Sequence, residues 1–198
     1  MIWKNIKLKT NLRKLIKKNE EIEDIIVFGS LVRGKIKPND IDIIVIFKNK
    51  VNKDIEYEIR KEIEKEYNNI SIISKTKENI LDEAFDARES ILFEGISLLS
   101  DENLADKYGF SSLGMFKYKL TDFNSLKKTK FYHTLNGRSG KEGIVNKLDA
   151  IKISDNLIFV PIEKIEEFKQ FLELWNINYT YIPTLIPKRL NKKSILEK

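Results

Sequence analysis

Residues 25–47 read Ile-Ile-Val-Phe-Gly-Ser-Leu-Val-Arg-Gly-Lys-Ile-Lys-Pro-Asn-Asp-Ile-Asp-Ile-Ile-Val-Ile-Phe, and this stretch decides the fold. Two apolar runs, Ile25–Phe28 and Ile41–Phe47, each have the length of a buried strand. The segment 37–39, Lys-Pro-Asn, is typical of a loop because Pro and Asn interrupt regular structure. The stretch therefore predicts two buried strands joined by a polar connection.

The first strand ends at a candidate anion-binding motif. Gly29 has no Cβ, so a phosphate can approach the backbone there. Ser30 adds a hydroxyl and is a good helix cap, so we expect a short helix after it whose first N–H groups face the same anion. Arg33 lies about one helical turn further on and can reach that anion. These three residues are the candidate nucleotide-binding residues.

Two carboxylates open the second strand. Only Ile41 separates Asp40 from Asp42, and alternate residues of a strand point to the same face. Carboxylates this close repel one another unless a cation lies between them or one is protonated. Mg²⁺ prefers oxygen ligands, commonly one or two carboxylates together with triphosphate oxygens and water. The pair therefore predicts a divalent metal site, for Mg²⁺ or Mn²⁺, of the kind that phosphoryl transfer uses.

The spacing of these residues resembles that of a known family. Asp40 follows Ser30 by ten positions, and the Asp-x-Asp pair is embedded in an apolar strand. This pattern is similar to the DNA polymerase β-like nucleotidyltransferase superfamily in its small, minimal form. Arg33-Gly34 also matches the Gly-Ser-x-x-Arg-Gly form of that superfamily. The likeness covers roughly residues 10–100, and the motif itself spans 29–42.

That resemblance implies both a fold and an activity. The implied fold is α+β, with a mixed sheet flanked by helices. The implied reaction is Mg²⁺-dependent transfer of a nucleoside monophosphate from an NTP, such as ATP, to a hydroxyl acceptor. The implied roles are nucleotide binding by Gly29, Ser30 and Arg33, and catalysis and metal binding by Asp40 and Asp42.

The third carboxylate of the superfamily has no evident counterpart. By the resemblance it belongs on the next strand, which here is 69–74, and Ser71 occupies its position. Ser is a poor Mg²⁺ ligand and a poor base. Either another residue supplies the group, or the protein is slow, or it is catalytically inactive. The acids that lie nearby in the sequence, with no place assigned, are Glu66, Glu78, Asp86, Glu89 and Glu94.

Regular patterns fill the rest of the first half. Asn11–Asn19 and Asp54–Tyr67 have helical spacing of apolar residues, and Ile70–Ile73 predicts a third strand. Asn79–Leu99 is expected to be mainly helical, with an extended segment as an alternative at its end. The polar segment Ser100–Gly109 predicts a domain boundary. We therefore expect a nucleotidyltransferase domain at residues 1–104 and a second domain at 105–198.

The second domain is expected to be a small basic α+β domain. The predicted order of helix, turn, helix, hairpin and helix is winged-helix-like. The predicted elements are helices at Asn124–Asn136, Lys141–Asp149 and Ile162–Trp175, a hairpin over 150–160, and a last strand at Tyr179–Ile182.

Positive charge is concentrated in this second half. Of the net charge of +6, residues 1–104 carry −1 and residues 105–198 carry +7. A basic half favours a polyanion partner, RNA or DNA first, although surplus lysine also serves solubility. The glycine-rich segment 137–141 either contacts phosphates or is a turn between helices. The basic residues around it are Lys127, Lys128, Lys130, Arg138 and Lys141.

Composition excludes several classes of protein. The chain has no Cys, which rules out disulfides and Cys-ligated zinc. The start of the sequence carries no pattern of a signal peptide, and no apolar run is long enough to span a bilayer. We expect a cytoplasmic protein without membrane partners.

Two other functions stay open from the sequence. The first is a catalytically inactive module that binds nucleotide or nucleic acid, which the serine at position 71 favours. The second is a protein-modifying nucleotidyltransferase that acts as an antitoxin, which the resemblance alone favours.

Overall fold

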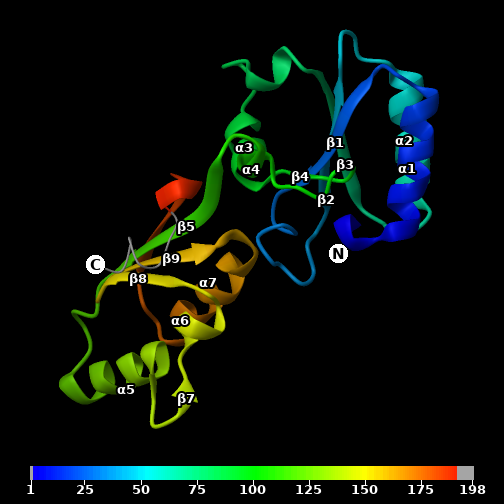
Figure 1. Ribbon diagram of the computed structural model, residues 1–198. Helices are drawn as coiled ribbons and strands as arrows, with labels where there is room; N and C mark the ends of the chain where they lie inside the picture. Colours follow the sequence, from blue (N-terminus) through cyan, green and yellow to red (C-terminus); the bar gives the residue numbers. More distant parts are fainter. Residues whose placement is uncertain (1, 191–198) are drawn as a thin grey trace. The chain divides into compact units, whose positions relative to one another are not determined.

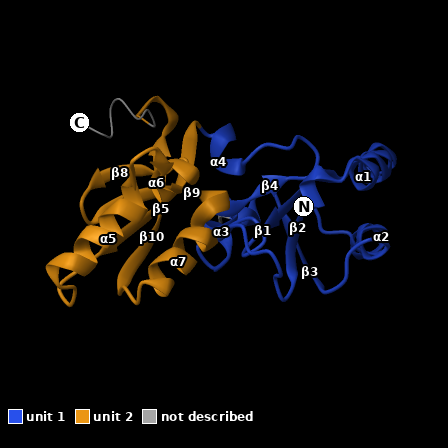
Figure 2. Ribbon diagram, turned by 90° about the horizontal axis from the view of Figure 1, so that it is seen from below, with its two compact units in different colours: residues 1–108 blue, residues 109–198 orange. Residues whose placement is uncertain are grey.

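The computed structural model describes residues 2–190 of the 198-residue chain. The chain divides into two compact units, residues 1–108 and 109–198 (Figures 1 and 2). The first unit thus extends four residues beyond the boundary expected from the sequence. Among the described residues, no helix combines the length and the apolar character needed to cross a bilayer.

The first unit is built on a mixed four-stranded sheet. Its strands lie in the order β3-β2-β1-β4. β1 is antiparallel to β2 and to β4, whereas β2 and β3 are parallel. The strands are β1 (Ile22–Phe28), β2 (Ile41–Phe47), β3 (Ile70–Thr76) and β4 (Ile96–Ser97). This mixed sheet confirms the fold expected for the first half of the chain.

Helices cover both faces of this sheet. α1 and α2 lie together on one face, and α3 and α4 lie on the other (Figures 1 and 2). The helical elements are η1 (Ile2–Lys4), α1 (Ile6–Lys18), α2 (Lys53–Glu64), η2 (Asn79–Leu81), α3 (Arg88–Glu94) and α4 (Leu104–Lys107). The sheet is therefore flanked by helices, as expected.

The alternation of side chains along β1 and β2 gives each face its own apolar layer. Ile26 and Ile44 pair across the two strands and share one face with Asp42. They form a buried cluster with Ile46 and with Ile91 of α3. α3 is thus fixed on the face of the sheet that carries Asp42.

The expectation of a mainly helical Asn79–Leu99 is wrong. Within it, α3 is the only α-helix, and it begins at Arg88. The Asp82 side chain accepts a hydrogen bond from the Ala84 N–H at 2.9 Å, and such local bonds compete with helix formation. Phe85 packs against the buried cluster from this irregular segment.

The second unit has a four-stranded antiparallel sheet in the order β10-β5-β9-β8. Its elements are β5 (Phe110–Tyr118), α5 (Ser125–Asn136), β6 (Gly137–Arg138), β7 (Lys141–Glu142), α6 (Ile144–Lys147), β8 (Ile151–Ser154), β9 (Leu157–Pro161), η3 (Ile162–Lys164), α7 (Ile165–Leu174), β10 (Tyr179–Pro187) and η4 (Lys188–Leu190). The expected helices and hairpin correspond to α5, α6, α7 and β8–β9.

Two strands of this sheet differ from the expectation. β5 was not expected, yet it pairs with both β9 and β10. β10 continues to Pro187, five residues past the predicted end, and it is an edge strand, where proline is tolerated. The winged-helix-like order was inferred without β5 and stays a prediction.

The glycine-rich segment 137–141 is a hairpin and not the simple turn between helices that the sequence also allowed, while contact of this segment with phosphates stays a prediction. β6 and β7 form a short hairpin, in which Arg138 pairs with Lys141. The two turn residues, Ser139 and Gly140, both have positive φ, at 52° and 79°, as in a type I′ turn.

Candidate nucleotidyltransferase site

Gly29 brings the end of β1 into contact with the carboxylate of Asp42. Its φ is +83°, and a Cβ added there would lie 2.3 Å from Asp42 Oδ2. Any side chain at this position would therefore collide with the carboxylate. The glycine is required both by its backbone conformation and by the close approach of Asp42.

Ser30 opens a hydrogen-bonded turn, and not the short helix expected from the sequence. The Val32 N–H donates to the Gly29 carbonyl at 3.1 Å, and the Lys35 N–H donates to the Ser30 carbonyl at 3.0 Å. The second bond spans five residues and closes the segment after a single turn. Peptide N–H groups of a turn can still line an anion site, but a helix dipole does not contribute.

Asp42 lies between β1 and β3 in the register of the sheet. Its neighbours are Phe28 on β1 and Ser71 on β3. Ser71 is thus directly beside Asp42. This is the residue that, by the resemblance, occupies the position of the third carboxylate. Asp40 is exposed and precedes β2, which begins at Ile41.

The pKa of the Asp42 carboxyl is raised. Burial is the largest cause, followed by the negative charges of Asp40 and then of Glu94, while the positive charge of Arg33 acts in the opposite direction. Three carboxylates and one guanidinium therefore lie within electrostatic reach of one another. Their excess negative charge is of the kind that a divalent cation neutralises.

Glu94 is a residue of this site that the sequence did not place. It ends α3, is only 4% exposed, and accepts a hydrogen bond from Arg33 Nη1 at 2.5 Å. Its other oxygen, Oε2, is buried and has no hydrogen-bond partner among the described residues. The sequence named Glu94 only as one of five nearby acids, without a signal that set it apart from the others.

The donor set fits a two-carboxylate metal site. Asp40 and Asp42 supply hard oxygen ligands, which suit Mg²⁺ when a triphosphate provides further oxygens. Within residues 2–190, no group of three or more acidic, His or Cys side chains is placed to hold a metal ion. The structure thus brings the turn after β1 next to Asp42, with Arg33 and Asp40 in electrostatic reach of its carboxylate.

Comparison with known proteins supports this interpretation. The family model described as polymerase beta nucleotidyltransferase matches residues 10–103. The first unit belongs to this superfamily. The second unit lies outside the match.

Two solved structures weakly resemble about half of this chain. One is described as a double Asp-to-Glu mutant of the toxin–antitoxin MntA-HpeT, with 18% identity and a TM-score of 0.35, covering 50% of this chain and 78% of that chain. The other is a tri-AMPylated HEPN toxin of Shewanella oneidensis in complex with MNT antitoxin, with 18% identity and a TM-score of 0.32, covering 51% and 76%. No curated protein matches the chain. Neither likeness bears on the function of this chain.

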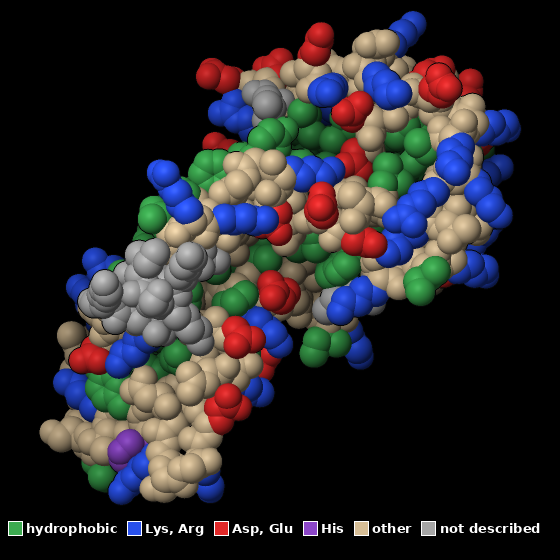
Figure 3. All heavy atoms as spheres, in the orientation of Figure 1, with side chains coloured by type: hydrophobic (Ala, Val, Ile, Leu, Met, Phe, Trp, Pro, Cys, Tyr) green, Lys and Arg blue, Asp and Glu red, His purple; other side chains and the backbone are tan. Residues whose placement is uncertain are grey.

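The second unit carries a surface of uncompensated positive charge. We call Lys127, Lys128, Lys130, Arg138 and Lys141 the basic α5 surface. None of them forms an ion pair with Asp or Glu in the described part of the chain, whereas the lysines of α6, β8 and α7 do, in pairs such as Lys147–Glu167 and Lys169–Glu166. Figure 3 shows Lys and Arg side chains at the end of this unit where α5 and β7 lie.

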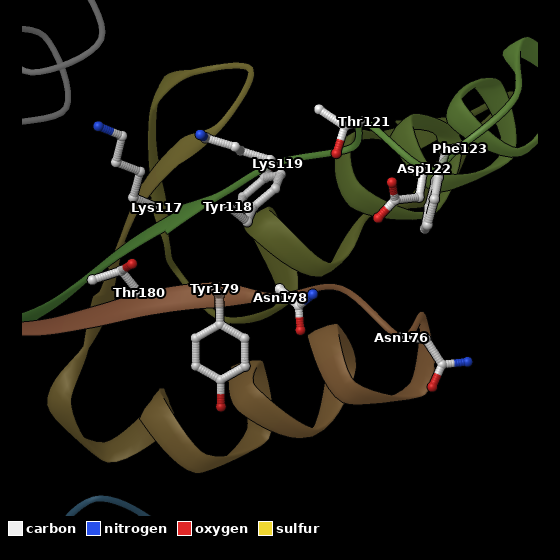
Figure 4. A pocket seen from close by; sticks show the side chains of 10 residues that line it. All are labelled: Lys117, Tyr118, Lys119, Thr121, Asp122, Phe123, Asn176, Asn178, Tyr179 and Thr180. Carbon is white, nitrogen blue, oxygen red and sulfur yellow. The ribbon is translucent and has the colours of Figure 1, made fainter.

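A polar groove adjoins the start of α5. It has a volume of about 460 Å³ and lies between the ends of β5 and β10. In Figure 4, the side chains of Lys117 and Lys119 extend on the same side of β5. Phe123 lines the groove too, and Lys127 Nζ lies 3.8 Å from the centre of its ring. The groove is therefore continuous with the basic α5 surface.

Proposed function

We propose that the protein transfers a nucleoside monophosphate from an NTP to a hydroxyl acceptor, with Mg²⁺ bound by Asp40 and Asp42. The observation that carries this proposal is the placement of Asp42, whose carboxylate lies against Gly29 and within electrostatic reach of Asp40. Crowded carboxylates beside a partly buried turn that carries Arg33 are matched to a cation and a phosphate chain.

Each residue of the motif has a separate task in this proposal. The turn from Gly29 to Arg33 would bind the triphosphate, and Asp40 and Asp42 would hold the metal. Mg²⁺, when bound, neutralises charge that develops on the phosphate oxygens. The acceptor oxygen forms a bond to the α-phosphorus, the bond to pyrophosphate breaks, and pyrophosphate leaves with the electron pair. Ser71 is no base, so the proton of the hydroxyl passes to water.

We further propose that the acceptor is RNA or DNA, bound by the second unit. The basic α5 surface has no acidic partners among the described residues, so its charge is available to phosphates. Lys117 and Lys119 extend this surface along the groove.

The direct test follows the label of an α-labelled NTP. The chain is incubated with each NTP, Mg²⁺ or Mn²⁺, and RNA, DNA or protein, and the labelled acceptor is identified. We expect Asp42→Asn to reduce transfer by a factor of about a thousand or more, because loss of a metal ligand removes several kcal/mol of transition-state stabilisation. Asp54→Asn, the same change at an exposed carboxylate in the first turn of α2, should transfer at the wild-type rate.

The acceptor that receives the label decides between the functions left open by the sequence. Label on RNA or DNA supports the full proposal. Label on a protein keeps the transfer reaction but replaces the acceptor, as in a protein-modifying antitoxin. Nucleic-acid binding without label on any acceptor means an inactive binding module, and undiminished transfer by Asp42→Asn contradicts the assigned site.

A further inference from the structure

Glu94 and Arg33 join two segments that are 61 residues apart in the sequence. Arg33 belongs to the turn after β1, and its side chain is 25% exposed. The Glu94 side chain is 6% exposed. The pair therefore has a buried end on α3 and a more open end on the motif turn.

The backbone at Glu94 is held firmly against β1. The next residue, Gly95, donates its N–H to the Ile91 carbonyl at 2.8 Å. A Cβ at Gly95 would lie 2.3 Å from that carbonyl oxygen and 2.9 Å from Ile26 Cγ2. β4 then pairs with β1 directly after it. The carboxylate of Glu94 is thus anchored to the same strand that leads into Gly29.

Stability does not explain this pair. Removing a carboxylate from water costs free energy. The attraction within a buried ion pair offsets that cost only if the remaining lone pairs of the carboxylate also accept hydrogen bonds. Glu94 Oε2 is buried without a hydrogen-bond partner among residues 2–190. An apolar side chain at this buried position would avoid the cost of removing a carboxylate from water. A function of the charge is the better explanation.

Direct contact with a metal or an acceptor does not explain it either. Glu94 is nearly inaccessible, and Arg33 lies against one of its two oxygens. The described residues contain no cluster of three acids arranged around a metal position. Glu94 therefore does not replace the carboxylate that is missing at Ser71.

We propose that Glu94 is the positioning residue of Arg33, and that it fixes the guanidinium so that the motif turn presents it to the triphosphate. This inference rests on the proposed function. A guanidinium carries five N–H donors in a planar fork, so one that is held by Glu94 can still donate to phosphate oxygens. Because the guanidinium of Arg33 is already held in place, less side-chain entropy is lost when the nucleotide binds.

The test measures nucleotide binding apart from turnover. The ligand is the α,β-methylene analogue of the NTP that labels best, which binds but cannot transfer its nucleoside monophosphate, and calorimetry in Mg²⁺ gives its Kd. We expect Glu94→Gln to weaken binding about tenfold and to raise KM with kcat within about threefold, since a charge-assisted hydrogen bond is lost. Glu89→Gln, at an 86% exposed side chain of the same helix, is the matched control and should bind as the wild type does.

A double-mutant cycle separates positioning from a direct role. Arg33→Gln should weaken binding at least as much as Glu94→Gln, and the double variant should be no weaker than Arg33→Gln alone, because Glu94 acts through Arg33. Fully additive losses overturn the inference, as does a fall in kcat at unchanged KM. A wild-type chain that binds the analogue, with Glu94→Gln within twofold of it, overturns the inference but not the proposed function. A wild-type chain that binds no analogue overturns both.

A second substitution keeps the inference testable if Glu94→Gln does not fold. Glu94→Asp retains the negative charge and withdraws the carboxylate from Arg33 by one methylene. Positioning predicts several-fold weaker binding of the analogue by this variant as well. Wild-type affinity in a folded Glu94→Asp variant would show that only the charge matters, which overturns the inference.

Discussion

Single side chains decide whether the site can form, and Gly29 is the clearest case. Gly29→Ala places a Cβ 2.3 Å from Asp42 Oδ2 at a positive φ. We expect it to destabilise the fold by about 1–3 kcal/mol and to reduce transfer by about a hundredfold, since displaced ligands lose the reacting geometry. Urea unfolding and the labelled-NTP assay measure the two effects.

Gly109 offers a matched control for this prediction. Its φ is +79°, but a Cβ there meets nothing within 4 Å. Gly109→Ala should therefore show the backbone penalty of about 1 kcal/mol and unchanged transfer. Equal losses of transfer in both variants would mean that the contact with Asp42 has no special role.

Ser71 permits a prediction of improved metal binding. The register puts it beside Asp42, so Ser71→Asp restores a carboxylate at the position where the superfamily pattern has one. Without metal, the added charge should lower the melting temperature, because it repels Asp42. With saturating Mn²⁺, the variant should be stabilised more than the wild type, by about 1.4 kcal/mol for a tenfold gain in affinity. Thermal unfolding with EDTA or with Mn²⁺ measures both signs.

The neutral variant Ser71→Asn is the control for size. It should respond to Mn²⁺ as the wild type does, because it adds no charge. A Ser71→Asp variant that ignores Mn²⁺ would place the metal away from β3 and contradict the assignment of Asp42 as a ligand.

At the scale of elements, the basic α5 surface can be tested as one unit. Changing Lys127, Lys128 and Lys130 together to Gln should weaken RNA or DNA binding and lower the slope of log K against log salt by about 2–3, close to one for each phosphate that is no longer neutralised. Fluorescence anisotropy over a range of salt concentrations gives this slope.

The control for this experiment removes the same number of positive charges from paired lysines. Lys147, Lys164 and Lys169 bond to acidic side chains of α7, so their change to Gln should alter the salt slope much less. If both triple variants show the same decrease in slope, net charge and not the α5 surface determines binding.

Elements of this chain differ in how well the sequence predicts them. β1, β2 and α2 are marked by apolar periodicity, and their positions followed within a few residues. The resemblance to the superfamily gave Ser71 the position of the third carboxylate, and the register places Ser71 beside Asp42. The spacing of apolar residues predicts these elements because it indicates which positions are buried.

Contacts between distant segments were not predictable in this way. The turn after Ser30 is closed by the Lys35 N–H bond, and its helical alternative looks the same in sequence. Glu94 differs from Glu89 through its hydrogen bond with Arg33, which lies 61 residues earlier in the sequence. The sequence near Glu94 therefore does not distinguish it from Glu89. β5 is stabilised by pairing with two later strands, β9 and β10, and such distant contacts are not visible in its own sequence.

At the scale of the whole molecule, the two units predict separable activities. The nucleotide motif lies in residues 1–108 and the basic α5 surface in residues 109–198. We expect Asp42→Asn to bind RNA or DNA within about twofold of the wild type, and the triple lysine variant of α5 to bind the NTP analogue equally unchanged, because substitutions at sites that share no partners are independent. Binding assays of both variants with both ligands test this. Loss of both ligands from one single-site variant would mean that the two sites are coupled.

The prolines of β10 bear on the association of one molecule with another. An outermost strand of nine residues presents a row of backbone donors and acceptors that a foreign strand could extend into a larger sheet. Pro183 and Pro187 have no N–H to offer, so that row is broken at two places. Replacing both prolines with residues of high strand propensity should therefore increase aggregation of the folded protein, although neither proline takes part in the proposed chemistry.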